Sequence, residues 1–179
     1  YRAQPVPSVS WSLTMFHHDW DQLRSAQQVP GVLENRIEGS VYGAETQASW
    51  QIARAWRITA GVTGLREELR LEAGSTDPVG ANNPNLANDP EYQWTVRSSW
   101  RIANDHDVDV FVRRVDDLPN PVVPDYTAVN VRYAWRVRPK VEISITGTNV
   151  SDGKHPEFGS AASRSVYERG VHGKILWGF

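Results

Sequence analysis

Alternation of apolar and polar residues, repeated along the whole chain, is the feature that most limits what this sequence can fold into. In residues 92–102 one parity carries Tyr92, Trp94, Val96, Trp100 and Ile102, and the residues of the opposite parity from Gln93 to Arg101 are all polar. Successive side chains of a β-strand point to opposite sides, so a period of two predicts strands with one apolar and one polar side. No sustained helical period accompanies it. The sequence therefore predicts an all-β, antiparallel protein.

Eight segments carry this pattern: residues 7–20, 37–52, 56–69, 92–102, 106–115, 126–137, 141–149 and 164–179. Most of them are long enough to cross an apolar layer of roughly 25 Å at the tilt of a membrane barrel, which takes about 9–11 residues. Tight turns at 54–55, 104–105 and 138–140 separate long polar links at 21–36, 70–91, 116–125 and 150–163. Short turns on one rim and long loops on the other are typical of an up-and-down transmembrane β-barrel of a bacterial outer membrane.

Most of the tryptophans fall on the apolar parity and near the rim of short turns. They are Trp11, Trp50, Trp56, Trp100, Trp135 and Trp177. Amphipathic rings settle at the level of lipid headgroups, so we interpret these six as membrane-interface aromatics. The alternative is a soluble antiparallel barrel or sandwich whose apolar sides point inward, because alternation alone does not say which side meets which solvent. A soluble core rarely concentrates its indoles at one rim, which favours the membrane barrel.

Composition excludes several other classes of protein. A net charge of -2 gives no reason to expect a nucleic-acid partner, and the absence of cysteine excludes disulfides and Cys-ligated metals. No apolar run approaches 18 residues, so we expect no transmembrane helix. A mean hydropathy of -0.51 is compatible with a membrane barrel, because lipid-facing and lumen-facing residues alternate and their average looks soluble.

The end of the chain resembles the end of a TonB-dependent outer-membrane receptor. The resemblance is carried by Gly147–Asp152 (GTNVSD), His155–Phe158 (HPEF) and the terminal Trp177-Gly178-Phe179. In that family the penultimate strand closes on a Gly-x-Asn-Leu-Phe-Asp-like motif, and the last strand ends in an aromatic, any residue, then Phe. Val150 and Ser151 stand here in place of the usual Leu-Phe. Residues 13–20, 38–46 and 124–127 resemble earlier strands of the same family.

This resemblance implies that residues 1–179 form the C-terminal portion of a barrel of about 22 strands. The plug domain and the segment that contacts the TonB complex would lie outside these residues. Such receptors bind a scarce nutrient, such as an iron–siderophore complex, at the cell surface and import it in a TonB-dependent manner. The alternative is a self-contained eight-stranded outer-membrane barrel with a structural or adhesion role. Pairing of segment 7–20 with segment 164–179 would favour that alternative.

Candidate contact residues fall into three groups. Binding residues concentrate on loops held by a rigid scaffold, so we expect contacts with a small-molecule ligand at Asp77, Asn82, Asn83, Asn85, His155, Glu157 and Phe158. Guanidinium forks suit carboxylate partners, so the polar-parity arginines Arg97, Arg101, Arg132 and Arg136 are candidates for the lumen wall that docks the plug. Trp177 and Phe179 match the terminal signal that the barrel-assembly machinery reads in outer-membrane proteins.

The histidines do not indicate a metal site or an enzyme. His17 and His18 are adjacent on a strand, so their side chains point to opposite sides and cannot share a metal ion. His155 and Glu157 could point the same way, but two ligands do not make a site. We therefore expect a transporter with no catalytic residues, no metal site and no cofactor.

Overall fold

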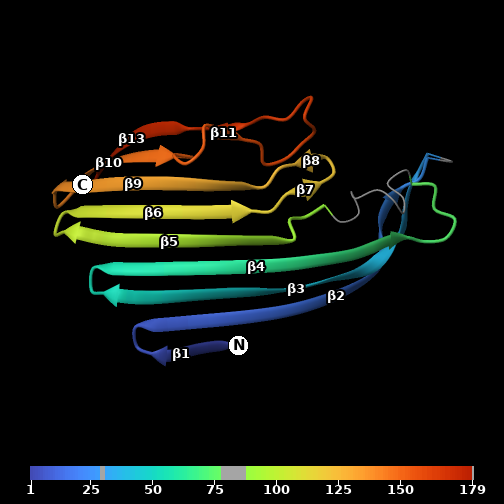
Figure 1. The fold of residues 1–179 in the computed structure, drawn as a ribbon, viewed down its shortest axis with the longest axis horizontal. Helices are drawn as coiled ribbons and strands as arrows, with labels where there is room; N and C mark the ends of the chain where they lie inside the picture. The colour runs from blue at the N-terminus through green and yellow to red at the C-terminus, as the bar shows by residue number, and fades with distance from the viewer. Residues whose placement is uncertain (29–30, 78–87, 179) are drawn as a thin grey trace.

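One antiparallel β-sheet makes up most of the molecule (Figure 1). The computed structural model describes residues 1–28, 31–77 and 88–178. The sheet consists, in spatial order, of β1 (Arg2–Val6), β2 (Val9–Ala26), β3 (Leu33–Ala53), β4 (Trp56–Leu71), β5 (Tyr92–Ala103), β6 (His106–Val115), β9 (Tyr126–Arg138), β10 (Val141–Thr148) and β13 (Gly170–Trp177). Two small hairpins lie outside it: β7 (Leu118–Pro119) with β8 (Val122–Val123), and β11 (Lys154–His155) with β12 (Tyr167–Glu168). Among the described residues, no helix has the length and apolar character needed to cross a membrane.

The observed strands differ from the expected segments in three places. β2 and β3 continue well past the alternating pattern, so most of the stretch 21–36, predicted to be a link, is strand. β1 is an additional short strand, paired antiparallel with β2. The predicted final strand 164–179 begins only at Gly170, because Tyr167 and Glu168 pair with β11 in a separate hairpin.

The register gives the sheet two chemically different sides. Directly paired residues lie on the same side of the sheet, so each row of paired residues stays on one side across the strands. One row contains Trp50, Ile58, Ser98, Val110 and Val131; the next contains Gln51, Arg57, Ser99, Asp109 and Arg132. We call the first the tryptophan side and the second the arginine side. We likewise call the two ends of the strands the turn end, where residues 54–55, 104–105 and 139–140 lie, and the loop end (Figure 1).

Apolar residues on the tryptophan side are largely exposed. Trp177 is 72% exposed, Ile175 70% and Ile143 43%. Buried hydrophobic side chains are few among the described residues: Ile37, Val123, Tyr126, Ala128 and Ala134. The aliphatic groups of the strands therefore do not meet in a dry interior, as they would in a soluble sandwich.

The two sides exchange polarity towards the loop end of β2, β3 and β4. On the tryptophan side the paired set Met15–Ala44–Gly64 is followed by the charged or polar sets His17–Tyr42–Arg66 and Asp19–Ser40–Glu68. On the arginine side the corresponding sets are Phe16–Gly43–Leu65, His18–Val41–Glu67 and Trp20–Gly39–Leu69. In β4 the apolar stretch of the tryptophan side, from Trp56 to Gly64, spans about nine residues, the length that crosses a hydrocarbon layer. Beyond this stretch, towards the loop end, the tryptophan side of β2–β4 is polar and charged.

Gly39 offers a test of this part of the sheet, because its backbone has φ +142° and a Cβ there would collide with the backbone of Glu68 and Leu69 in β4. We expect Gly39→Ala to lower the free energy of unfolding by more than about 1 kcal/mol, measured by urea unfolding of the intact protein with tryptophan fluorescence. Gly153→Ala is the matched control, because nothing lies within 4 Å of a Cβ at that position. Equal stability of the two variants would contradict the strained register at Gly39.

Candidate functional site on the arginine side

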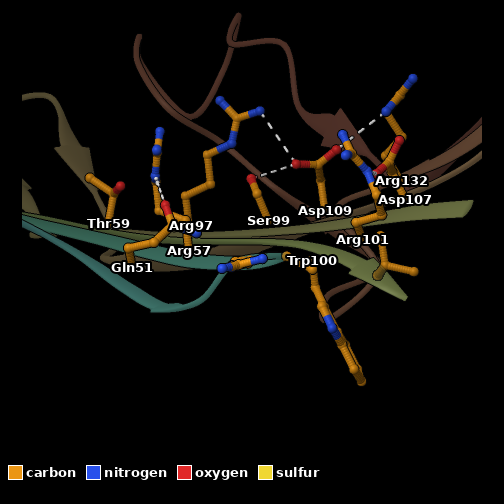
Figure 2. Close-up of a pocket in the computed structure, with 13 residues that line it drawn as sticks. Gln51, Arg57, Thr59, Arg97, Ser99, Trp100, Arg101, Asp107, Asp109 and Arg132 are labelled. Carbon is orange, nitrogen blue, oxygen red and sulfur yellow. Dashed lines mark hydrogen bonds and ion pairs between the residues drawn. The ribbon is translucent and has the colours of Figure 1, made fainter. Parts of the chain in front are cut away.

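Ion pairs organise the turn end of the arginine side. Asp109 on β6 lies 3.5 Å from Arg97 on β5 and 3.2 Å from Arg132 on β9, and it accepts a hydrogen bond of 2.6 Å from the hydroxyl of Ser99. Figure 2 shows these side chains on one side of the strands and Trp100 on the other. One carboxylate thus holds two guanidinium groups from the strands on either side of it.

A second carboxylate repeats this arrangement nearer the turns. Asp107 lies 3.2 Å from both Arg101 and Arg136, and Arg132 also pairs with Glu142 on β10. The arginines outnumber their partners: Arg57 hydrogen-bonds Gln51 at 2.8 Å, and Arg97 remains 62% exposed. A hollow of about 570 Å³ is lined by Arg57, Arg97, Arg101, Arg132, Asp107 and Asp109, among others. This surface is polar and accessible to water, and it holds more guanidinium groups than carboxylates. It is therefore suited to carboxylate or phosphate groups of a partner.

The four arginines predicted for the lumen wall therefore do lie on one side, but they are not equivalent. Arg101, Arg132 and Arg136 share the carboxylates of Asp107, Asp109 and Glu142. Arg97 has the longest ion pair of the group and the most open side chain. Arg57 has polar parity in the sequence but was not among these four candidates, and its side chain lines the same hollow. The signal available in the sequence was the position of Arg57 on the polar parity of residues 56–69.

The loop after β10 is fastened to the arginine side by His155 and Glu157. His155 is only 5% exposed; its ring stacks on Tyr126 at 4.2 Å between centroids, and its Nε2 lies 3.1 Å from Glu157 Oε1. Glu157 pairs with Arg113 of β6, which also lies 5.2 Å from the centre of the Tyr126 ring. These contacts hold the loop against the loop ends of β6 and β9. Phe158, the next residue, is 59% exposed.

Asp77 likewise takes part in hydrogen bonds that join the segment after β4 to the end of β2. Its carboxylate accepts a hydrogen bond of 2.5 Å from the amide of Ala26, and the side chain is buried. The Gln27 amide oxygen accepts a hydrogen bond of 2.5 Å from the amide of Thr76, and its NH₂ donates to Ser25 at 2.8 Å and Ser75 at 3.0 Å. The predicted contacts Asn82, Asn83 and Asn85 lie outside the described residues. Of the predicted ligand-contact residues that are described, Phe158 is thus the most accessible.

Two ionisable side chains at the loop end, Tyr42 and Glu67, have raised pKa values. On the tryptophan side a hydrogen bond to Glu68, at 2.7 Å, raises the pKa of Tyr42. On the arginine side burial raises the pKa of Glu67, and the negative charge of the neighbouring Asp89 acts in the same direction.

The six predicted interface aromatics all lie on the tryptophan side towards the turn end. Trp56 and Trp100 are direct partners with ring centroids 5.9 Å apart, and Trp135 stacks on His106 at 5.8 Å. Trp11 and Trp50 occupy β2 and β3, and Trp177 pairs with Val141 at the end of β13. Phe179 lies outside the described residues. Within the described part of the chain, no group of three His, Asp or Glu residues is placed to hold a metal ion.

Comparison with solved structures supports the fold, whereas comparison of sequences identifies no family. No protein-family profile and no curated protein sequence matches the chain. Among solved structures, the chain is similar to the ferric-catecholate import receptor Fiu of Escherichia coli K12 (15% identity, TM-score 0.72), the ferric yersiniabactin uptake receptor FyuA of Yersinia pestis (16%, 0.73) and the FrpB iron transporter of Neisseria meningitidis (13%, 0.78).

These similarities cover 98–99% of this chain but only 26–29% of those receptors. The chain therefore has the fold of one part of the barrel wall of such receptors and spans less than a third of their length. The resemblance to TonB-dependent receptors found in the sequence is confirmed at the level of the fold. The similar proteins are named as receptors and transporters, not as enzymes.

The loop anchor can be tested with Glu157→Gln, which keeps the size of the side chain and removes the charge that pairs with Arg113. We expect the loop to loosen, so that trypsin cleaves after Lys154 and Arg164 at least several-fold faster in the folded protein. Glu168→Gln is the control, because Glu168 is exposed on the neighbouring β12. Unchanged cleavage in Glu157→Gln would show that the ion pair does not hold the loop.

Proposed function

We propose that the chain is the C-terminal part of the barrel wall of a TonB-dependent receptor in the outer membrane of a Gram-negative bacterium. The tryptophan side would face lipid and the arginine side a water-filled bore. The observation that carries this proposal is the pair of opposite polarity changes in β2–β4. An outward surface that is apolar for about nine residues and charged beyond them is expected where a strand leaves the hydrocarbon layer.

The edges of the sheet favour a larger barrel over a self-contained one. β1 and β13 are the two ends of the strand order, and in the described residues they pair only with β2 and β10. Unpaired strand edges cannot remain exposed to hydrocarbon, because their N–H and C=O groups would lack partners. Further strands of the intact receptor would pair with them. The eight-stranded alternative would need the two edges to meet.

In this proposal the receptor binds a scarce nutrient, such as an iron–siderophore complex, at the cell surface and imports it with energy delivered through the TonB complex. It carries out no chemistry of its own. The surplus guanidinium groups of Arg57 and Arg97 would meet acidic groups of the plug domain inside the bore. Phe158 would be available to ligand, whereas Trp177 with Phe179 would serve as the assembly signal.

Two neighbouring substitutions on β4 test which side faces lipid. Ala60 lies on the tryptophan side within the apolar band, and Thr59 lies beside it on the arginine side. In lipid vesicles we expect Ala60→Arg to lower the free energy of unfolding by about 2–4 kcal/mol and Thr59→Arg to change it by less than about 1 kcal/mol. Urea titration of the refolded intact receptor measures both. The reverse order would overturn the assignment of the two sides.

Transport is tested in a strain that lacks the gene and in the same strain complemented with it. We expect the protein in the outer-membrane fraction, and gene-dependent uptake of one compound from a panel of ferric chelates and cobalamin. Because import would use the proton-motive force, a protonophore should abolish uptake and leave surface binding intact. Recovery of the protein in the soluble fraction would contradict the proposal.

A further inference from the structure

Three aromatic rings form a strip on the arginine side of β2 at its loop end. Phe16, His18 and Trp20 alternate along the strand and therefore share one side. Their ring centroids are 5.8 Å apart between Phe16 and His18 and 6.1 Å apart between His18 and Trp20, with interplanar angles of 31° and 39°. We call these three residues the aromatic strip.

The aromatic strip is accessible from the arginine side. Trp20 is 46% exposed and His18 is also exposed. The neighbouring strand β3 places Gly43 opposite Phe16 and Gly39 opposite Trp20, so it contributes no side chain that could cover those two rings. Beyond β3, Leu65 and Leu69 of β4 continue the surface as an apolar flank. An open aromatic surface beside apolar side chains and bare backbone suits a flat ligand.

Charge is segregated along the strands, which restricts the ligand further. From the paired row Ser12–Gln47–Gly61–Thr95–Arg113 to the turns lie eleven of the 19 Lys and Arg residues but only four of the 21 Asp and Glu residues: Asp105, Asp107, Asp109 and Glu142. The loop end therefore carries 17 carboxylates and eight cations. Potentials of this kind concentrate solutes of opposite charge and disfavour those of like charge.

The groups that face the aromatic strip fit the same picture. Glu67 of β4 lies in the same paired set as His18, and Asp89 lies next to Glu67. Among the described arginine-side positions of β3 from Ile37 to Gly43 and of β4 from Leu65 to Leu71, none is Lys or Arg. A cation over the faces of these rings would be attracted by their quadrupoles, Trp being the strongest such partner.

We propose that the aromatic strip binds a planar heteroaromatic cation, with Trp20 and His18 stacking on the ring and Glu67 supplying the opposite charge. This inference rests on the proposed function, because it takes the arginine side as the wall of the bore above the membrane. It adds one feature to the nutrient of the proposed function: a flat, positively charged ring that contacts the aromatic strip. The strip is distinct from the arginine-lined hollow at the turn end.

The test uses the intact receptor in detergent and three probes with one ring system and different charge. They are N-methylquinolinium, quinoline and quinoline-2-carboxylate, and equilibrium dialysis measures their dissociation constants. We expect N-methylquinolinium to bind at least about ten-fold more tightly than the carboxylate, with quinoline in between. Trp20→Ala should weaken binding of N-methylquinolinium about ten-fold, and Trp50→Ala, on the tryptophan side, should leave it unchanged.

Stability and location separate the possible failures. If Trp20→Ala does not reach the outer membrane, Trp20→Leu keeps an apolar side chain, removes the aromatic face and should show the same loss of binding. A receptor that sits in the outer membrane and imports a nutrient, yet binds the carboxylate as tightly as N-methylquinolinium or binds neither, would overturn the aromatic-strip proposal alone. A protein absent from the outer membrane would overturn the proposed function.

Discussion

The continuous ladder of backbone hydrogen bonds across nine strands is the interaction on which the rest of this structure depends. It satisfies main-chain groups without help from water wherever neighbouring strands overlap, and it locks the register so that each row of paired residues stays on one side of the sheet. A slip of one residue in β5 or β9 would move indoles to the arginine side. The side chains therefore need no buried hydrophobic interior to be placed reliably.

The ionic groups of the arginine side are held by the same register. Asp107 and Asp109 sit on β6, and each receives one arginine from β5 and one from β9, so the carboxylates link three strands at two successive levels. Partly exposed ion pairs of this kind contribute little stability one by one. Their value here is geometric, since they fix long side chains in a surface that would otherwise be loosely ordered.

Much of the sheet could be predicted from sequence because period two is a local signal. The alternation in residues 92–102 and 126–137, the tight turns at 54–55 and 104–105, and the common side of the six tryptophans all follow from short stretches of chain. β1, with five residues, is too short to show a pattern. The extensions of β2 and β3 were mistaken for a link because residues 21–26 and 33–36 are mostly polar, and because the register of β2 shifts on both sides of Leu23.

The loop residues were harder to predict because their partners are distant in sequence. His155 and Glu157 lie more than 40 residues from Arg113, and Asp77 lies 51 residues from Ala26. Nothing in the local sequence distinguishes a histidine that faces solvent from one that stacks on Tyr126. Composition showed that the loops are polar, and only the fold shows which polar groups are already occupied by the protein itself.

The exchange of sides in β2–β4 also makes the height of the apolar surface an adjustable property. Two residues of strand advance the chain by roughly 6–7 Å and restore the original facing of every later side chain. A matched two-residue insertion, before Met15 in β2, after Ala44 in β3 and before Gly64 in β4, would move the charged sets further from the turn end while keeping the pairings among these three strands. Proteins of this architecture can thus adapt to bilayers of different thickness by lengthening neighbouring strands in concert, with no change to the ring of indoles at the opposite rim.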